Sequence, residues 1–248
     1  MDTIYILWLR QIKRYLRSKS RIIGSLGQPI LFLFALGFGF GPIFQSAGQG
    51  NYIQFLAPGI IAMSVLFTSI FSGIEIIWDR EFGFLKETLV APVSRLEIVL
   101  GKTLGGATVA IFQGIIVFLI SLLAGFKPVS PSGVFLAFLA MILTAILFTS
   151  LGTAIASVLD DMHGFQLIMN FLIMPLFFLS GAMFPLGGLP ETIGKITSLN
   201  PLSYGVDGIR GNLTGLWHFG LTTDFMVLII VTLILLSLGS YLFSKIQI

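Results

Sequence analysis

The most constraining feature of the sequence is a charge-free tract that runs from Ile22 to Ile74. About 20 consecutive apolar residues cross a bilayer as a helix, so this tract is long enough for two membrane spans. Gly, Pro and Gln between Gly41 and Tyr52 mark the turn. Charged residues make up only 10% of the chain, against about 25% in a soluble domain. The sequence therefore predicts an integral membrane protein.

Charges return between Glu75 and Lys102, and four more apolar stretches follow. We expect one transmembrane domain over residues 1–248, an all-α membrane protein with six transmembrane helices. The predicted spans lie at about 22–41, 55–77, 103–124, 133–158, 165–183 and 225–244. A proline after Gln28 predicts a kink in the first span.

The distribution of Lys and Arg predicts the orientation. Six spans place both termini on one side, and eleven of the 14 cations lie there: Arg10, Lys13, Arg14, Arg17, Lys19, Arg21, Arg80, Lys86, Arg95, Lys102 and Lys245. Only Lys127, Lys195 and Arg210 lie opposite. Because cytoplasmic loops are enriched in Lys and Arg, we expect both termini in the cytoplasm, with membrane lipids and no nucleic acid as the partners of the basic residues.

Residues 4–20 predict an amphipathic helix that lies in the membrane interface. At 100° per residue, one side carries Ile4, Trp8, Ile12, Tyr15 and Leu16, and the other carries Arg10, Lys13, Arg14 and Arg17. The alternative is an ordinary basic flank of the first span.

The sequence lacks the residues that several kinds of chemistry require. There is no Cys and there are only two His, His163 and His218, so thiolate and histidine-built metal sites are not expected. Gly101-Lys102-Thr103 resembles the end of a P-loop, but Leu96 stands where that motif needs glycine. We expect Glu75 and Asp224 at the membrane interface, which leaves the spans without the buried charges of an ion-coupled carrier.

The connection from 75 to 102 is the most charged part outside the N-terminus. The stretch 80–90 predicts a short amphipathic helix that ends at Ala91-Pro92, because a residue before proline avoids the α conformation. Ser94 and Glu97 have the spacing of a capping box that starts the next helix. Such a helix suits docking to another protein, and a solvated loop is the alternative.

The same connection, "DREFGFLKETLVAPVSRLEIVLGKTLGG", resembles the permeases of ABC-2 type transporters. A second stretch, Leu179 to Gly211, resembles the external re-entrant segment of that family. By this resemblance, Arg80, Glu81, Gly83, Lys86 and Glu87 form a cytoplasmic coupling helix, followed by a turn with Pro92, Ser94 and Arg95. Asn200, Pro201 and Arg210 belong to the external gate segment.

The resemblance implies the membrane subunit of an ATP-binding cassette exporter in the cell membrane, closest to daunorubicin-resistance-type drug exporters. Its substrate is then hydrophobic or amphipathic, drug-like or lipid-like, and moves between two copies of the chain. The chain itself is not an enzyme and holds no cofactor, since a separate ATPase subunit binds ATP and Mg. Two alternatives stay open: a polysaccharide or lipid-linked glycan exporter of the same family, and a membrane assembly protein that transports nothing.

Overall fold

The computed structural model describes residues 2–46, 50–90, 92–187 and 190–246, and every regular element in these ranges is an α-helix. Five stretches are long and apolar enough to cross a membrane. They are α2 (Lys19–Ser46), α3 with α4 (Tyr52–Phe71 and Ile74–Glu81), α6 (Arg95–Leu123), α7 (Pro131–Val158) and α11 (Leu221–Ser244). The sixth apolar helix, α8 (Met162–Phe178), has 17 residues and is therefore about 25 Å long. The predicted all-α membrane architecture is confirmed.

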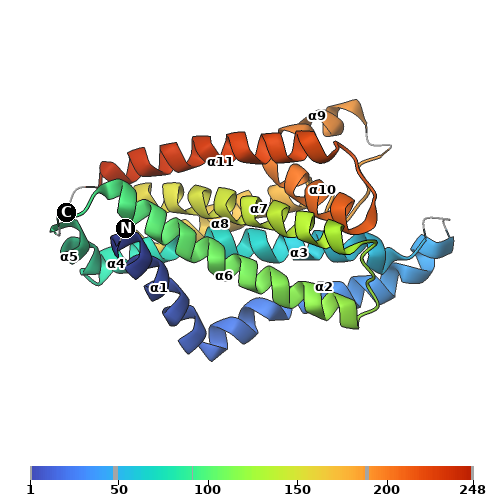
Figure 1. Ribbon diagram of the computed structural model, residues 1–248, viewed down its shortest axis with the longest axis horizontal. Helices are drawn as coiled ribbons and strands as arrows, with labels where there is room; N and C mark the ends of the chain where they lie inside the picture. The colour runs from blue at the N-terminus through green and yellow to red at the C-terminus, as the bar shows by residue number, and fades with distance from the viewer. Residues whose placement is uncertain (1, 47–49, 91, 188–189, 247–248) are drawn as a thin grey trace.

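The helices run roughly side by side along the long axis of the molecule (Figure 1). The start of α1 (Asp2–Arg17), the end of α11, α4 and the short helix α5 (Phe84–Val90) all lie at one end. The helices α9 (Glu191–Leu199) and α10 (Pro201–Thr214) lie at the other end. Both chain ends thus lie on one side of the bundle, as an even number of spans requires.

The predicted second span, 55–77, is not one helix. It breaks at Ser72 and Gly73, between α3 and α4. A Cβ on Gly73 would lie 2.5 Å from the carbonyl oxygen of Gly152 in α7, and a Cβ on Gly152 would lie 2.4 Å from that of Ile70. The two backbones therefore touch where the helix breaks, a contact that only glycine permits.

The N-terminal amphipathic helix is α1, which ends at Arg17, three residues before the predicted end. It crosses α6 obliquely (Figure 1), and Leu7, Gln11 and Tyr15 are buried there. Gly101 and Gly105 of α6 allow this close approach, since a Cβ at Gly105 would lie 2.6 Å from Gln11. One side of α1 thus packs on protein.

The predicted re-entrant segment consists of α9 and α10, neither of which is long enough to span. All of α10 from Leu202 to Leu213 is buried, against α3, α7 and α11. Asn200 lies between the two helices and caps α10, since its Oδ1 accepts the N–H of Leu202 at 3.0 Å.

Candidate functional site

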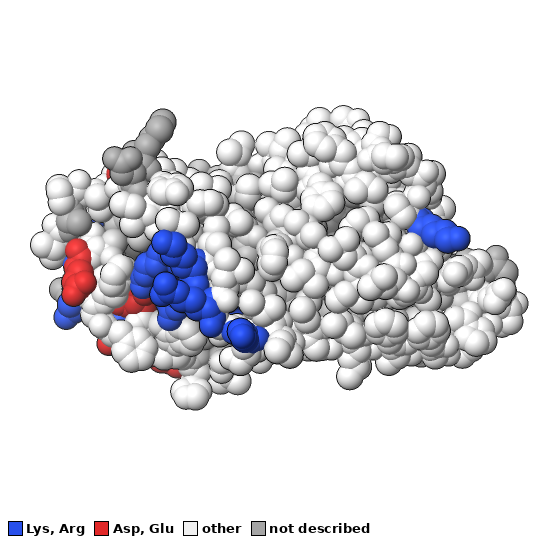
Figure 2. All heavy atoms as spheres, turned by 60° about the horizontal axis from the view of Figure 1, so that its bottom comes forward, with Lys and Arg blue, Asp and Glu red and all other residues white. Residues whose placement is uncertain are grey.

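We call the end of the molecule that carries α1, α4 and α5 the basic end. Figure 2 shows Lys and Arg side chains gathered there, with a lone basic side chain in view at the opposite end. A smaller number of acidic side chains is in view beside this cluster, mostly toward the same end of the molecule. The basic end is therefore a mixed charged surface that faces out of the apolar bundle.

Two carboxylates of α4 are buried beneath this surface. Asp79 forms ion pairs with Lys102 of α6 and with Arg10 of α1, the latter at 2.7 Å. Glu75, one helical turn earlier, binds Arg21 of α2 at 2.8 Å. Arg14 lies 3.9 Å from both carboxylates.

This ion-pair cluster connects α4 to α1, α2 and α6. Glu75 and Asp79 are each only 4% exposed, and Lys102 is equally buried, so the pairs are shielded from solvent. Asp224, the other carboxylate expected at the membrane interface, is 0% exposed, so protein covers both side chains. Arg21 of α2 and Arg14 of α1 lie close enough to Glu75 to balance its charge.

Arg80, the first predicted coupling residue, bonds within the chain. Its guanidinium donates to the carbonyl oxygens of Ser157 and Leu159, at 3.2 and 3.1 Å, and forms an ion pair with Asp160. These carbonyls end α7, where backbone acceptors lack helical partners. Arg80 thus ties α4 to the end of α7.

The predicted helix over 80–90 is two pieces. Arg80 and Glu81 end α4, Gly83 has φ +80°, and α5 begins at Phe84. A residue in this left-handed conformation interrupts a right-handed helix, so Gly83 turns the chain. Ala91, part of the predicted helix end, lies outside the described residues.

The exposed side chains around the turn at Gly83 come from both sides of it, from the end of α4 and from α5. Glu81, Lys86 and Glu87 are exposed, and so are the apolar Phe82 (79%) and Val90 (86%). Leu85 is buried and Arg10 lies over the ring of Phe84 at 3.6 Å from its centroid, which anchors α5 on α1 and α4. We call Glu81, Phe82, Lys86, Glu87 and Val90 the corner surface.

The turn behind α5 follows the predicted pattern. Ser94 accepts the N–H of Glu97 at 3.2 Å, and Glu97 accepts the N–H of Ser94, so the predicted capping box is confirmed. Pro92 is exposed in this turn, and Arg95 is the first residue of α6.

Gly101-Lys102-Thr103 lies inside α6, where Lys102 pairs with Asp79 and Gly101 contacts α1. These three residues form part of a helix and not the phosphate-binding loop that their sequence suggests.

The predicted gate residues lie at the opposite end, in two separate places on α10. Arg210, more than two turns into the helix, donates to the carbonyl oxygens of Phe55 and Ala182, at 3.3 and 3.1 Å, and its guanidinium lies 4.0 Å from the centre of the Phe55 ring. At the start of the helix, Asn200 donates to the carbonyl of Leu176 at 2.7 Å, and Pro201 is the first residue of α10. Arg210 and Asn200 thus hold α10 to α3, to α8 and to the chain that follows α8.

Sequence reasoning missed the buried partners of these residues. The sequence alone places Asp79 in a charged connection and Lys102 at the start of a span, and it assigns neither of them a partner. The spacing of Glu75 and Asp79, four residues apart, was a usable signal, because it places both carboxylates on one helical face.

Comparisons with known proteins agree with this architecture. The family model described as "ABC-2 type transporter" matches residues 2–214. The inner membrane transport permease YadH of Escherichia coli K12 is 31% identical over 230 residues, which cover 90% of this chain and 88% of YadH. Nodulation protein J of Sinorhizobium fredii is 28% identical over 207 residues, 82% of this chain and 78% of that protein. The family match runs from α1 through α10 and ends before α11, and the chain belongs to the ABC-2 type transporter family.

Proposed function

We propose that the chain is the permease subunit of an ABC exporter that moves a hydrophobic or amphipathic substrate out of the cytoplasm. Two copies form the path through the plasma membrane, and a separate ATPase subunit binds ATP and Mg and supplies the energy. In this arrangement the basic end faces the cytoplasm, which agrees with the excess of Lys and Arg there.

The observation that carries the proposal is the corner surface. It combines exposed charges of both signs with two exposed apolar side chains, from the end of α4 through the turn at Gly83 to the short helix α5, at one end of the bundle. Exposed apolar groups rimmed by polar ones are typical of protein interaction sites. A soluble ATPase is the partner that a transport permease requires.

The corner surface is also connected to the membrane helices. Glu81 and Phe82 directly follow Asp79 and Arg80, which hold α4 to α1, α6 and the end of α7. A force applied to α5 thus reaches three other helices through ion pairs and hydrogen bonds. Arg80 acts as a transmitting residue inside the permease, while Glu81, Lys86 and Glu87 contact the ATPase.

The experiment is co-expression with an ATP-binding cassette ATPase encoded beside the permease, followed by co-purification and reconstitution in liposomes. Glu81→Lys and Lys86→Glu should lower the yield of complex and the ATP hydrolysis that the permease stimulates. Losing a buried paired charge at an interface costs about 2–5 kcal/mol. Lys127→Glu, at the opposite end, is the matched charge reversal and should leave assembly unchanged.

The outcomes separate the alternatives. If the permease binds no ATPase and the corner variants behave like the parent protein, the exporter proposal is wrong and an assembly role is favoured. If the complex forms but exports only glycan-linked lipids, the drug-like substrate is wrong and the glycan exporter reading replaces it. ATP hydrolysis by the permease alone would contradict the assignment of this activity to a separate ATPase subunit.

A further inference from the structure

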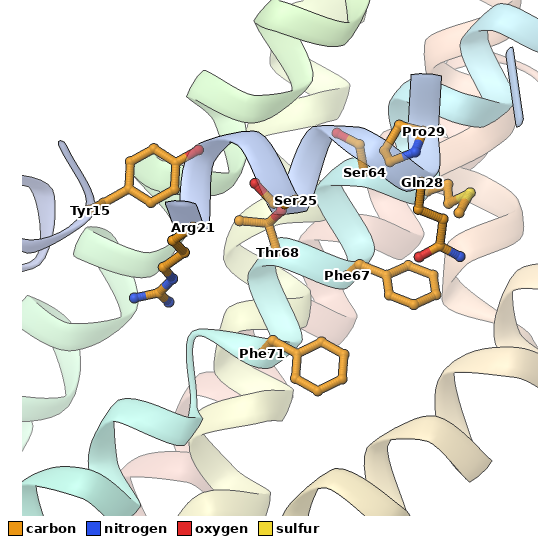
Figure 3. A pocket seen from close by; sticks show the side chains of 11 residues that line it. Tyr15, Arg21, Ser25, Gln28, Pro29, Ser64, Phe67, Thr68 and Phe71 are labelled. Atoms are coloured by element: carbon orange, nitrogen blue, oxygen red, sulfur yellow. The ribbon is translucent and has the colours of Figure 1, made fainter. Parts of the chain in front are cut away.

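A cavity of about 380 Å³ lies between α2 and α3 near the basic end (Figure 3). Pockets for drug-sized ligands range over about 300–1,000 Å³, so its size suits one small molecule. Gly24 and Gln28 of α2 line it and are exposed, so the cavity is reached from the surface of the bundle. No residue of the corner surface or of the gate segment takes part in it.

One wall of the cavity is polar and fixed. Tyr15 of α1 and Ser25 of α2 line it, and their hydroxyls both donate to Oε1 of Gln113 in α6, at 2.7 and 2.9 Å. Gln113 is completely buried, so it holds both hydroxyls in place from behind. Burial raises the pKa of Tyr15, which keeps its phenol protonated.

Ser64 of α3 adds an unpaired group to the same cavity. It is 2% exposed, and its hydroxyl has no hydrogen-bond partner among the residues that the structure describes. Four other buried hydroxyls on the long helices, those of Ser69, Thr103, Thr149 and Thr232, also lack a partner among the described residues, but of this group only Ser64 lines the cavity. A buried hydroxyl without a partner costs free energy, and a ligand atom in the cavity would remove that cost.

The charge around the cavity favours an anion. Arg21 lines it and belongs to the ion-pair cluster, in which four cations, Arg10, Arg14, Arg21 and Lys102, share two carboxylates, Glu75 and Asp79. The cluster thus holds two more cations than carboxylates, and Arg21, which is paired with Glu75 at 2.8 Å, brings the edge of this positive cluster to the cavity.

The remaining wall is apolar and aromatic. Phe67 and Phe71, one turn apart on α3, point their rings to the same side as the Gln28 side chain in Figure 3. Rings in this position suit the apolar body of a ligand whose polar head lies near Arg21.

We propose that this cavity binds an amphipathic organic anion that enters from the membrane, with its oxyanion head at Arg21 and its apolar body on Phe67 and Phe71. The inference rests on the proposed exporter function in one respect: the bound anion is the transported substrate. Binding itself is a property of the permease chain alone.

Because the chain contains no Cys, a single Thr68→Cys variant reports on the cavity, which Thr68 lines. The purified permease in phosphatidylcholine nanodiscs is labelled with N-ethylmaleimide. Decyl phosphate should slow the labelling, whereas decyltrimethylammonium and inorganic phosphate should not. Ser69→Cys, at a fully buried neighbouring position, should stay unlabelled throughout, which shows that the bundle remains closed.

Two substitutions at exposed glycines of α2 provide a matched pair. A Cβ on Gly24 or on Gly27 meets nothing within 4 Å, but only Gly24 lines the cavity. Gly24→Leu should abolish the protection by decyl phosphate and Gly27→Leu should preserve it, with both variants folded. Arg21→Gln should weaken protection roughly tenfold, the loss expected for one hydrogen bond to a charged group.

Equal protection by decyltrimethylammonium would overturn the assignment of an anion. Protection by inorganic phosphate alone would mean a simple ion site, and no protection by any probe would mean that the cavity is no binding site. These results are independent of ATPase assembly. If the permease binds decyl phosphate but no ATPase, the proposed anion site is supported and the proposed exporter function is wrong. If it binds the ATPase but no decyl phosphate, the exporter function is supported and the anion site is wrong.

Discussion

Lys102 and Asp79 form an ion pair inside the protein, with 4% and 5% of their side chains exposed. Lys102 follows Gly101 near the start of the long apolar helix α6, and Asp79 lies near the end of the short helix α4. Each charge is tolerated because the other lies beside it, and Arg10 provides a second partner for Asp79.

Replacing Asp79 with Asn should strongly destabilise the permease, because Lys102 is left buried without its partner. Breaking a buried pair typically costs about 3–5 kcal/mol. The double variant Asp79→Asn, Lys102→Met should recover most of this loss. The free energy of unfolding of each purified variant in detergent measures the loss and its recovery. A double variant as unstable as the single one would contradict the pairing.

Arg80→Ala should weaken the permease itself, since two carbonyls at the end of α7 lose their donor. A hydrogen bond to a charged group contributes about 1.5–3 kcal/mol to stability. Asp160→Asn removes only the exposed partner and should cost less than about 1 kcal/mol. The same unfolding assay compares the two variants. Equal losses of stability in Arg80→Ala and Asp160→Asn would show that the carbonyl contacts contribute little.

Gly73→Ala and Gly152→Ala should each disturb the crossing of the α3–α4 break with α7. A methyl group at either position would lie within about 2.5 Å of a carbonyl oxygen on the other helix, and overpacking of this kind costs about 1–3 kcal/mol or more. Gly39→Ala is the control, since a Cβ there meets nothing within 4 Å. That variant should be neutral or up to about 1 kcal/mol more stable. Stable variants at both contact glycines would refute the close approach.

Arg210→Lys should loosen α10 although the charge is kept. A lysine ammonium lacks the planar fork that reaches the carbonyls of Phe55 and Ala182 together. Proteolysis between α8 and α10 should become faster. Lys195→Met removes an exposed pair with Glu191, worth about 0.5 kcal/mol, and should not change the cleavage rate.

The proposed orientation predicts opposite labelling of two cysteines. In intact cells, an impermeant thiol reagent should modify Lys127→Cys and should leave Lys86→Cys unmodified until the membrane is opened. Both positions are exposed, and the parent chain has no Cys to react. Labelling of Lys86→Cys from outside would reverse the orientation.

The sequence predicted those features that depend on local chemistry. The helices begin and end within five residues of the predicted spans, except that α6 begins at Arg95, eight residues before the predicted third span, where the Ser94–Glu97 capping box marks its start. The turn at Gly83 was available to the same reasoning, because glycine is the usual residue for a positive φ.

Contacts between helices were out of reach of that reasoning. Asp79 meets Lys102 because of the angle and depth at which α4, α1 and α6 pack, which no periodicity encodes. The tie from Arg80 to α7 likewise joins residues about eighty positions apart. The cavity between α2 and α3 depends on the same packing.

The contact of Gly73 with Gly152 also bears on how such a protein can diverge. A clash between two side chains can be relieved by shrinking either one, but here backbone meets backbone and neither residue has anything left to remove. No second substitution on the opposite helix compensates for a side chain at either position. Side chains at the walls of the cavity, such as those at Gly24 and Phe67, can therefore change more freely than the joint between α3 and α4, which admits no side chain at either glycine.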